Sequence, residues 1–295
     1  MSKLSNCVAE RQSSSKLCKH KKKLILLVLL LVIVAVFLDS NLRLVKSELT
    51  VTLNGLPEAF DGKVIVHLSD SHMQRLRCER LIAMVRSANP DMIVHTGDLA
   101  DTSVSIDEEA LYGDIGGFFQ KLADIAPTYF ISGNHDIAVR RFMERVTPIL
   151  HAGGVTVLRN DYVVLERDGQ GVILAGIDDQ LNWHHPNVLI DLRARIDESH
   201  DDPYIMLLAH RYNRLGKYAA NGMDFVMAGH SHGGVVRLPL IGAIFSTRGG
   251  LFPRNAAGIS RHGDTTMVTS RGIGAWRPPR FWNNPEVVVI TLESR

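Results

Sequence analysis

Five short segments of the chain combine aspartate, asparagine and histidine in patterns that suit metal binding. They are Asp70-Ser71-His72, Gly97-Asp98-Leu99-Ala100-Asp101, Gly133-Asn134-His135-Asp136, Leu208-Ala209-His210 and Gly229-His230-Ser231-His232. Imidazole and carboxylate groups together suit manganese, iron or zinc. Each segment alone is a weak signal, because Gly-Asp and His-x-His pairs occur often by chance. The five together indicate one site built from distant parts of the chain.

Short apolar runs precede these segments, and each run predicts a β-strand. In the first half of the chain, the strand-like runs and the helix-like stretches between them cover 64–69, 76–88, 92–96, 108–122, 128–132 and 139–150. This alternation is typical of parallel βαβ units. Ligands in open α/β sheets gather at the carboxyl ends of the strands. We therefore expect the five segments to meet at one end of a sheet.

The second half of the chain is richer in strands. Strand-like runs lie at 155–158, 162–166, 172–177, 204–209, 224–228, 235–238, 265–270 and 286–292. Helices are expected only near 187–196 and 213–220. The combined pattern predicts an α/β fold, a two-sheet αββα sandwich, with a membrane helix at the N-terminus.

Composition and charge restrict the function further. An apolar fraction of 45% and a charged fraction of 22% fit a globular protein. Seven basic residues and one acidic residue precede Leu24, so the rest of the chain has 26 basic and 30 acidic residues and a net charge of −4. This mildly acidic body argues against a broad nucleic-acid surface. Cys78 is the only cysteine in the body, so no disulfide forms within it.

Residues 24–38 form an uninterrupted apolar run that follows a lysine cluster. Its 15 residues reach only ~22 Å as a helix, whereas a bilayer core is ~30 Å thick. Snorkelling lysines or local thinning would let it span, and the competing signal peptide lacks an Ala-x-Ala-like cleavage site. We predict an uncleaved, single-pass anchor in the cell (inner) membrane, with the basic N-terminus in the cytoplasm and the body outside. The expected organisation is a basic tail at 1–23, the anchor at 24–38, a linker at 39–49 and one catalytic domain at 50–295.

The five segments and their order resemble the calcineurin-like metallophosphoesterase superfamily, whose blocks run D-x-H, G-D-x-x-D, G-N-H-D/E, a lone histidine and G-H-x-H. Outside these blocks, residues 268–274, Pro279-Arg280-Phe281 and Pro285-Glu286 resemble the membrane-anchored bacterial branch, as do Leu56-Pro57 and Phe60-Asp61-Gly62. The resemblance covers roughly residues 50–293.

This resemblance implies two divalent metal ions, which we expect to be manganese, iron or zinc. The implied ligands are Asp70, His72 and His232 for one ion, Asn134, His210 and His230 for the other, and Asp98 as the bridge. Two such ions lower the pKa of a shared water, and the hydroxide attacks phosphorus in line. The resemblance gives His135 the task of protonating the leaving oxygen or stabilising its charge. Asp101 and Asp136 are expected to orient ligands or loops.

The predicted function is hydrolysis of a phosphoester, with a membrane-associated and possibly lipid-linked substrate. One alternative is a UDP-2,3-diacylglucosamine pyrophosphatase of lipid A synthesis, which requires a cytoplasmic site, against the charge rule. A second is a non-catalytic metal-binding scaffold that presents residues 271–282 to a partner. The sequence does not choose the natural substrate or the oligomeric state.

For several other residues the sequence either indicates a structural role or leaves a functional and a structural role open. His67 and His95 lie inside predicted strands and are expected in the core. Arg211 either contacts a substrate phosphate or caps its loop, and His184 and His185 either line the substrate entrance or are exposed. A basic and aromatic loop that either contacts a lipid headgroup or packs as an ordinary loop contains Arg271, Trp276, Arg277, Arg280, Phe281 and Trp282.

Overall fold

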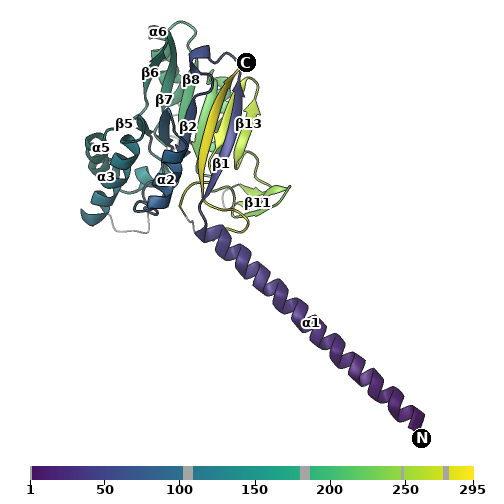
Figure 1. The fold of residues 1–295 in the computed structure, drawn as a ribbon. Coiled ribbons are helices and arrows are strands. Elements are labelled where there is room, and N and C mark those ends of the chain that lie inside the picture. Colours follow the sequence, from purple (N-terminus) through teal and green to yellow (C-terminus); the bar gives the residue numbers. More distant parts are fainter. Residues whose placement is uncertain (1, 102–108, 180–186, 247–248, 275–278) are drawn as a thin grey trace.

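Two six-stranded mixed sheets lie face to face, with helices on both outer faces (Figure 1). The computed structural model describes residues 2–101, 109–179, 187–246, 249–274 and 279–295, with side chains from residue 20 onward. The predicted αββα sandwich is therefore confirmed.

The first sheet joins the two ends of the body to the βαβ units of the first half. Its strand order is β1 (Val45–Leu53), β15 (Glu286–Ser294), β2 (Val64–Leu68), β3 (Met92–His95), β4 (Thr128–Phe130) and β5 (Val155–Val157). Neighbouring strands are parallel except for the antiparallel β15 and β2. The first half also contains η1 (Glu58–Phe60), α2 (Glu79–Ser87), α3 (Glu109–Ala123), α4 (Asn134–Ala138) and α5 (Phe142–Ala152).

The second sheet is formed by the second half of the chain. Its order is β13 (Gly258–His262), β14 (Thr265–Thr269), β9 (Phe225–Gly229), β8 (Ile205–Arg211), β7 (Gln170–Gly176) and β6 (Asp161–Arg167). Its helices are α6 (Val188–Ser199), η2 (Tyr212–Arg214) and α7 (Leu215–Ala220). A separate small sheet contains β10 (Val236–Leu238), β11 (Gly242–Ser246) and β12 (Gly250–Leu251).

Alternation along the central strands builds the core. In β8, Met206 and Leu208 pack between the two sheets, whereas Ile205 and Leu207 face the α6 and α7 side. This period of two is the geometry of a strand that is buried on both faces. His67 and His95 are fully buried, and burial lowers the pKa of each to about 3. Both are core residues, as expected from their strand positions.

The N-terminal boundary of the body differs from the expected linker at 39–49. The helix α1 (Ser2–Leu42) continues through its first part, and β1 begins at Val45 and pairs with β15 along all nine residues. Val45, Ser47 and Leu49 are partly buried and lie on the same side of β1 as the buried Val51 and Leu53. The polar Ser47 and the charged residues beside it interrupt the apolar pattern, so the sequence does not indicate this part of the strand. Only two residues separate α1 from β1.

The membrane-span candidate is also longer than the apolar run. Residues 20–42 form a 23-residue segment of α1 that is long and apolar enough to cross a membrane by length and composition. At 1.5 Å per residue it reaches ~34 Å, compared with ~30 Å for a hydrocarbon core. The segment is longer than the apolar run because residues 20–23 before the run and 39–42 after it are also helical.

Besides β1, three strands were not expected from the sequence. These are β11, β12 and β13, which are short and contain glycines, so they lack a long β-branched run. The helix α2 begins at Glu79 rather than near residue 76, because Met73 and Arg75 have left-handed backbone angles and delay the first helical turn.

A truncation series tests the role of the first five residues of β1. A chain that begins at Thr50 loses five of the nine pairs with β15 and the packing of Leu44 and Leu49. We expect a loss of about 3 kcal/mol of stability and a drop in melting temperature of about 10 °C, relative to a chain that begins at Asp39. Thermal unfolding followed by circular dichroism measures the difference. Equal melting temperatures would show that the domain begins at residue 50.

Candidate metal centre

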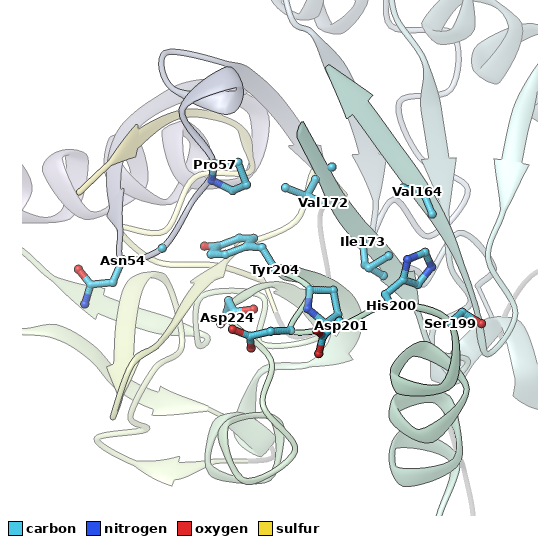
Figure 2. Close-up of a pocket in the computed structure, with 14 residues that line it drawn as sticks. Asn54, Pro57, Val164, Val172, Ile173, Ser199, His200, Asp201, Tyr204 and Asp224 are labelled. Carbon is cyan, nitrogen blue, oxygen red and sulfur yellow. The ribbon is translucent and has the colours of Figure 1, made fainter. Parts of the chain in front are cut away.

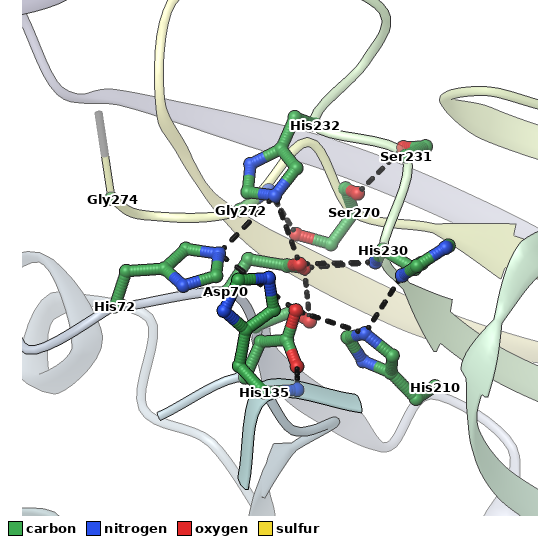
Figure 3. Close-up of polar contacts among 12 residues, drawn as sticks. Asp70, His72, His135, His210, His230, Ser231, His232, Ser270, Gly272 and Gly274 are labelled. Atoms are coloured by element: carbon green, nitrogen blue, oxygen red, sulfur yellow. Dashed lines mark hydrogen bonds and ion pairs between the residues drawn. The ribbon is translucent and has the colours of Figure 1, made fainter. Parts of the chain in front are cut away.

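The seven expected ligands lie at the carboxyl ends of strands from both sheets. Asp70 and His72 follow β2, Asp98 follows β3, and Asn134 begins α4 after β4. His210 is the second-to-last residue of β8, and His230 and His232 follow β9. Figure 3 shows the rings of His72, His210 and His232 directed toward the carboxylates, and Nδ1 of His230 facing Nε2 of His210. Six of the seven are less than 9% exposed, and His232 is partly buried.

The backbone of these loops is held in an uncommon conformation. Five of the expected ligands have left-handed angles, with φ of 51° at Asp70, 45° at His72, 55° at Asp98, 68° at His230 and 49° at His232. A non-glycine residue in this region costs of order 1 kcal/mol or more, and such residues concentrate at functional sites. Hydrogen bonds maintain it, including Asp70 N–H to Gly97 O at 2.9 Å and His72 N–H to Asp98 O at 3.0 Å.

Two glycines allow the loops to approach each other closely. A Cβ atom on Gly133 would lie 2.9 Å from Cγ of Asp98 and even closer to its backbone nitrogen. A Cβ atom on Gly229 would lie 2.5 Å from Oδ2 of Asp70. No side chain fits at either position without displacing a carboxylate. The glycines in the Gly-Asn-His and Gly-His-Ser-His segments are therefore part of the site geometry.

The side chains form two groups that share one carboxylate. Asp70, His72, Asp98 and His232 each offer one ligand atom, and these atoms all lie within 4.8 Å of one another. Asp98, His210 and His230 form a second group by the same measure. Asn134 is buried at the start of α4, next to His135, whose N–H donates to Oδ1 of Asp98 at 2.8 Å. The shared position of Asp98 has the geometry of a bridging ligand.

Backbone carbonyls orient two of the imidazoles. Nδ1–H of His72 donates to Ala100 O at 3.0 Å, and Nδ1–H of His210 donates to Thr96 O at 2.7 Å. A carbonyl oxygen only accepts, so these contacts assign the proton to Nδ1. Each Nε2 atom then presents a lone pair to the site, as a metal-ligating imidazole does.

Each of these Nε2 atoms faces another ring nitrogen or a carboxylate oxygen at short distance. His210 Nε2 lies 3.2 Å from Oδ2 of Asp98 and 3.1 Å from Nδ1 of His230, and His72 Nε2 lies 3.2 Å from Nε2 of His232. Two lone pairs at this distance repel each other unless a proton or a cation lies between them. The donor set of nitrogen and carboxylate oxygen therefore fits divalent ions such as manganese, iron or zinc.

The protonation equilibria indicate the same preference for positive charge. Burial lowers the pKa of His210, but the Asp98 charge and its hydrogen bond outweigh burial and raise that pKa to about 10. Burial raises the pKa of Asp98, yet the charge of His210 and its hydrogen bond bring that pKa well below its usual value. The Asp98 carboxylate therefore favours positive charge at this point of the site.

Arg280 is the functional neighbour that its place in the sequence did not reveal. Its side chain is 1% exposed, donates from Nη2 to Gly274 O at 2.7 Å, and lies 3.4 Å from Nδ1 of His232. Burial, followed by the charges of His72 and Arg280, lowers the pKa of His232 well below its usual value. A neutral imidazole is the form that binds a metal ion. Arg280 thus lies directly behind His232 at the edge of the site.

Asp136 connects two of the loops. Its carboxylate accepts hydrogen bonds from Ala100 N–H at 2.6 Å and from Gly133 N–H at 2.8 Å. Burial and then the charge of Asp98 raise its pKa to about 7. The expected loop-orienting role of Asp136 matches these contacts, and Asp101 is half-buried.

The structure also places the residues with two interpretations. Arg211 donates from Nε and Nη2 to Asp179 at 2.7 and 2.9 Å, so it fixes the loop after β7. Arg271 pairs with Glu286 at 2.5 Å. In the basic and aromatic loop, Trp282 is 45% exposed. His184, His185, Trp276 and Arg277 lie outside the described residues.

A second hollow lies at the other end of the strands and lacks this chemistry. Its volume is about 580 Å³, and its lining includes Pro57, His200, Asp201, Tyr204 and Asp224 (Figure 2). His200, Asp201 and Tyr204 lie before β8 and Asp224 before β9, and Tyr204 is about 20 Å along β8 from His210. Within the described part of the chain, the groups of side chains that could hold a metal ion lie at the carboxyl ends of the strands and not in this hollow.

Comparisons with known proteins agree with this geometry. The sequence pattern of the calcineurin-like phosphoesterase family matches residues 63–234. The chain is 30% identical over 259 residues to the uncharacterized metallophosphoesterase YkuE of Bacillus subtilis strain 168, which covers 84% of this chain and 85% of YkuE. It is 28% identical to the transmembrane protein with metallophosphoesterase domain of Danio rerio, over 84% of this chain and 57% of that protein. It is 28% identical to the phosphodiesterase YaeI of Escherichia coli K12, over 77% and 81% of the two chains.

Metal content tests the shared position of Asp98. We expect two equivalents of divalent metal in the native chain. Asp98→Ala should remove both, because both groups use this carboxylate. His232→Ala should remove only one. Elemental analysis by mass spectrometry measures the content, and circular dichroism checks the fold. His200→Ala, at the distant hollow, is the control, and an Asp98→Ala protein with two equivalents would contradict the assignment.

Proposed function

The chain belongs to the calcineurin-like phosphoesterase family, and from this premise we propose that it is a metal-dependent phosphohydrolase acting on ester bonds. The observation that carries the proposal is the pair of ligand groups that share the Asp98 carboxylate. We assign Asp70, His72 and His232 to one divalent ion, Asn134, His210 and His230 to the other, and Asp98 to both. Manganese, iron and zinc suit this donor set, and manganese is the first ion to supply in an assay.

Two bound divalent ions would supply an activated water at neutral pH and would neutralise the phosphoryl oxygens. The protein supplies the orientation. Carbonyl oxygens of Thr96 and Ala100 hold the imidazoles of His210 and His72 in the ligand tautomer, and Asp136 ties the loops together. A preoriented site requires no rearrangement as charge develops on the substrate.

We assign His135 to the leaving oxygen. Its ring is buried and lies edge-on to His72, with ring centroids 4.7 Å apart. Its backbone N–H donates to Oδ1 of Asp98 at 2.8 Å, which holds the residue beside the metal groups. The imidazole can therefore donate a proton to an alkoxide leaving group beside the metal groups, which contributes typically ~10²–10⁴ in rate.

Two assays test the reaction. Purified protein with Mn²⁺ should hydrolyse bis-p-nitrophenyl phosphate, and Asp98→Ala or Asn134→Ala should abolish turnover while the fold survives.

His135→Gln should slow the hydrolysis of an alkyl phosphoester by about 10² or more and slow that of a nitrophenyl ester less, because nitrophenolate leaves without a proton. Release of product is followed by absorbance or by phosphate detection. Full activity of Asp98→Ala would refute the proposal.

We further propose that α1 is an uncleaved membrane anchor and that the natural substrate is membrane-associated. The length of residues 20–42 supports the anchor, as does the similarity to the transmembrane protein of Danio rerio. The lysine cluster before Leu24 supports a cytoplasmic N-terminus and a body on the outer face. This arrangement supports our assignment of the chain to the membrane-anchored bacterial branch of the family.

A reporter fused after Arg295 tests the orientation. Alkaline phosphatase at this position should be active and green fluorescent protein should be dark, because the positive-inside rule places the body outside. A fluorescent fusion with inactive phosphatase would place the catalytic domain in the cytoplasm. That result would also favour the UDP-2,3-diacylglucosamine pyrophosphatase alternative, which requires a cytoplasmic site.

A further inference from the structure

The small sheet exposes large apolar side chains that the hydrolase reaction does not use. We name this surface the apolar apron, and it consists of Leu240, Ile241, Phe245, Leu251, Phe252 and Trp282. Leu240, in the turn between β10 and β11, is fully exposed, and Leu251 is 71% exposed. Phe245 and Leu251 are direct cross-strand partners and therefore project from the same face. Clustered apolar exposure of this kind marks an interaction site.

Two consecutive residues connect the apolar apron to the end of α1. Asn41, in the last turn of α1, accepts a hydrogen bond from Arg280 N–H and donates one to Arg280 O, both at 2.9 Å. The next residue, Phe281, bridges to Val236 of β10 and exchanges backbone hydrogen bonds at 3.0 Å with Val235 and Arg237. The sheet that carries β11 accordingly lies beside the point where α1 leaves the body (Figure 1).

The depth of this surface relative to a bilayer follows from α1. The apolar run ends at Leu38, and Asn41 lies three residues further, or about 4.5 Å along the helix. Because β1 starts at Val45, no flexible linker separates the body from the helix. A membrane-spanning α1 therefore holds the apolar apron at the depth of the lipid headgroups.

The charge of this region is complementary to an anionic bilayer. Residues 233–257, which include the small sheet, contain three arginines and no aspartate or glutamate, although the body as a whole is acidic. Arginines beside an apolar surface favour the interface of anionic lipids, where exposed aromatic side chains also partition. A protein partner would have to replace lipid at this position, so the bilayer is the occupant that the geometry favours.

We propose that the apolar apron inserts into the interfacial layer of an anionic bilayer and turns the metal centre toward the lipid surface. The metal centre lies at the same end of the molecule, since Arg280 contacts both Asn41 and His232. The substrate class is then a phosphoester in the headgroup plane. This inference rests on the proposed hydrolase function and anchor, and it specifies where the substrate is taken from.

Site-specific fluorescence tests the insertion directly. The full chain, with Cys7→Ser, Cys18→Ser and Cys78→Ser, is reconstituted in nanodiscs of phosphatidylcholine and phosphatidylglycerol at 7:3. A polarity-sensitive label is attached to Leu240→Cys or Leu251→Cys, and the control label is at Val164→Cys, which lines the distant hollow. We expect blue-shifted emission and quenching by spin-labelled lipid at 240 and 251, but quenching by aqueous iodide at 164.

Two fluorescence results would overturn the proposal. Labels at 240 and 251 that are quenched by iodide as strongly as the label at 164 would show that the apolar apron stays in water. A chain that does not enter nanodiscs through α1 would overturn both the anchor and the insertion.

A kinetic comparison separates this surface from the reaction itself. Leu240→Glu should lower the rate on hexadecyl p-nitrophenyl phosphate in 7:3 vesicles at least tenfold and leave hydrolysis of soluble bis-p-nitrophenyl phosphate unchanged. Val164→Glu should change neither rate. An unchanged vesicle rate in Leu240→Glu would overturn the proposal. A wild-type chain inactive on both substrates would refute the hydrolase function, and the labels would still decide the insertion.

Discussion

The buried carboxylate of Asp98 is the group on which the arrangement of the site depends. It is 1% exposed, faces imidazoles from both sheets and accepts the N–H of His135. An isolated charge in such a place is strongly unfavourable, so its neighbours must provide compensating positive charge. Strands from both halves of the chain end here because their loops supply that compensation. The need to compensate the charge of Asp98 therefore links the meeting of the two sheets to the chemistry of the site.

Local features of the loops show how much conformational freedom this meeting removes. Left-handed angles at Asp70 and His230, and contacts that only glycine permits at 133 and 229, are unfavourable for isolated loops. The surrounding core stabilises them, since Leu68, Phe130 and Leu208 next to the loops are fully buried. The packed core of the sandwich thus stabilises the strained backbone of the loops at this end of the molecule.

The sequence predicted the parts of the molecule whose signals are local. Strands β2, β3, β4, β8 and β9 are apolar runs followed by polar motifs, and both the sandwich and the convergence of the motifs followed from them. Strand β1 was missed because its partner β15 lies some 240 residues away and Ser47 interrupts the apolar pattern. Arg280 was expected in a loop that either contacts a lipid headgroup or packs as an ordinary loop, because the Gly274 carbonyl and His232 beside it are brought there only by the fold.

The two-residue passage from α1 to β1 has a consequence for how an anchored chain finds its substrate. With α1 as the proposed anchor, a domain on a long tether would sample a hemisphere of solution, whereas this domain would translate and rotate with its helix. Encounters with a substrate in the same leaflet would then depend on lateral diffusion in two dimensions. The short joint would raise the effective concentration of such a substrate at the site, because it keeps the site at the membrane surface.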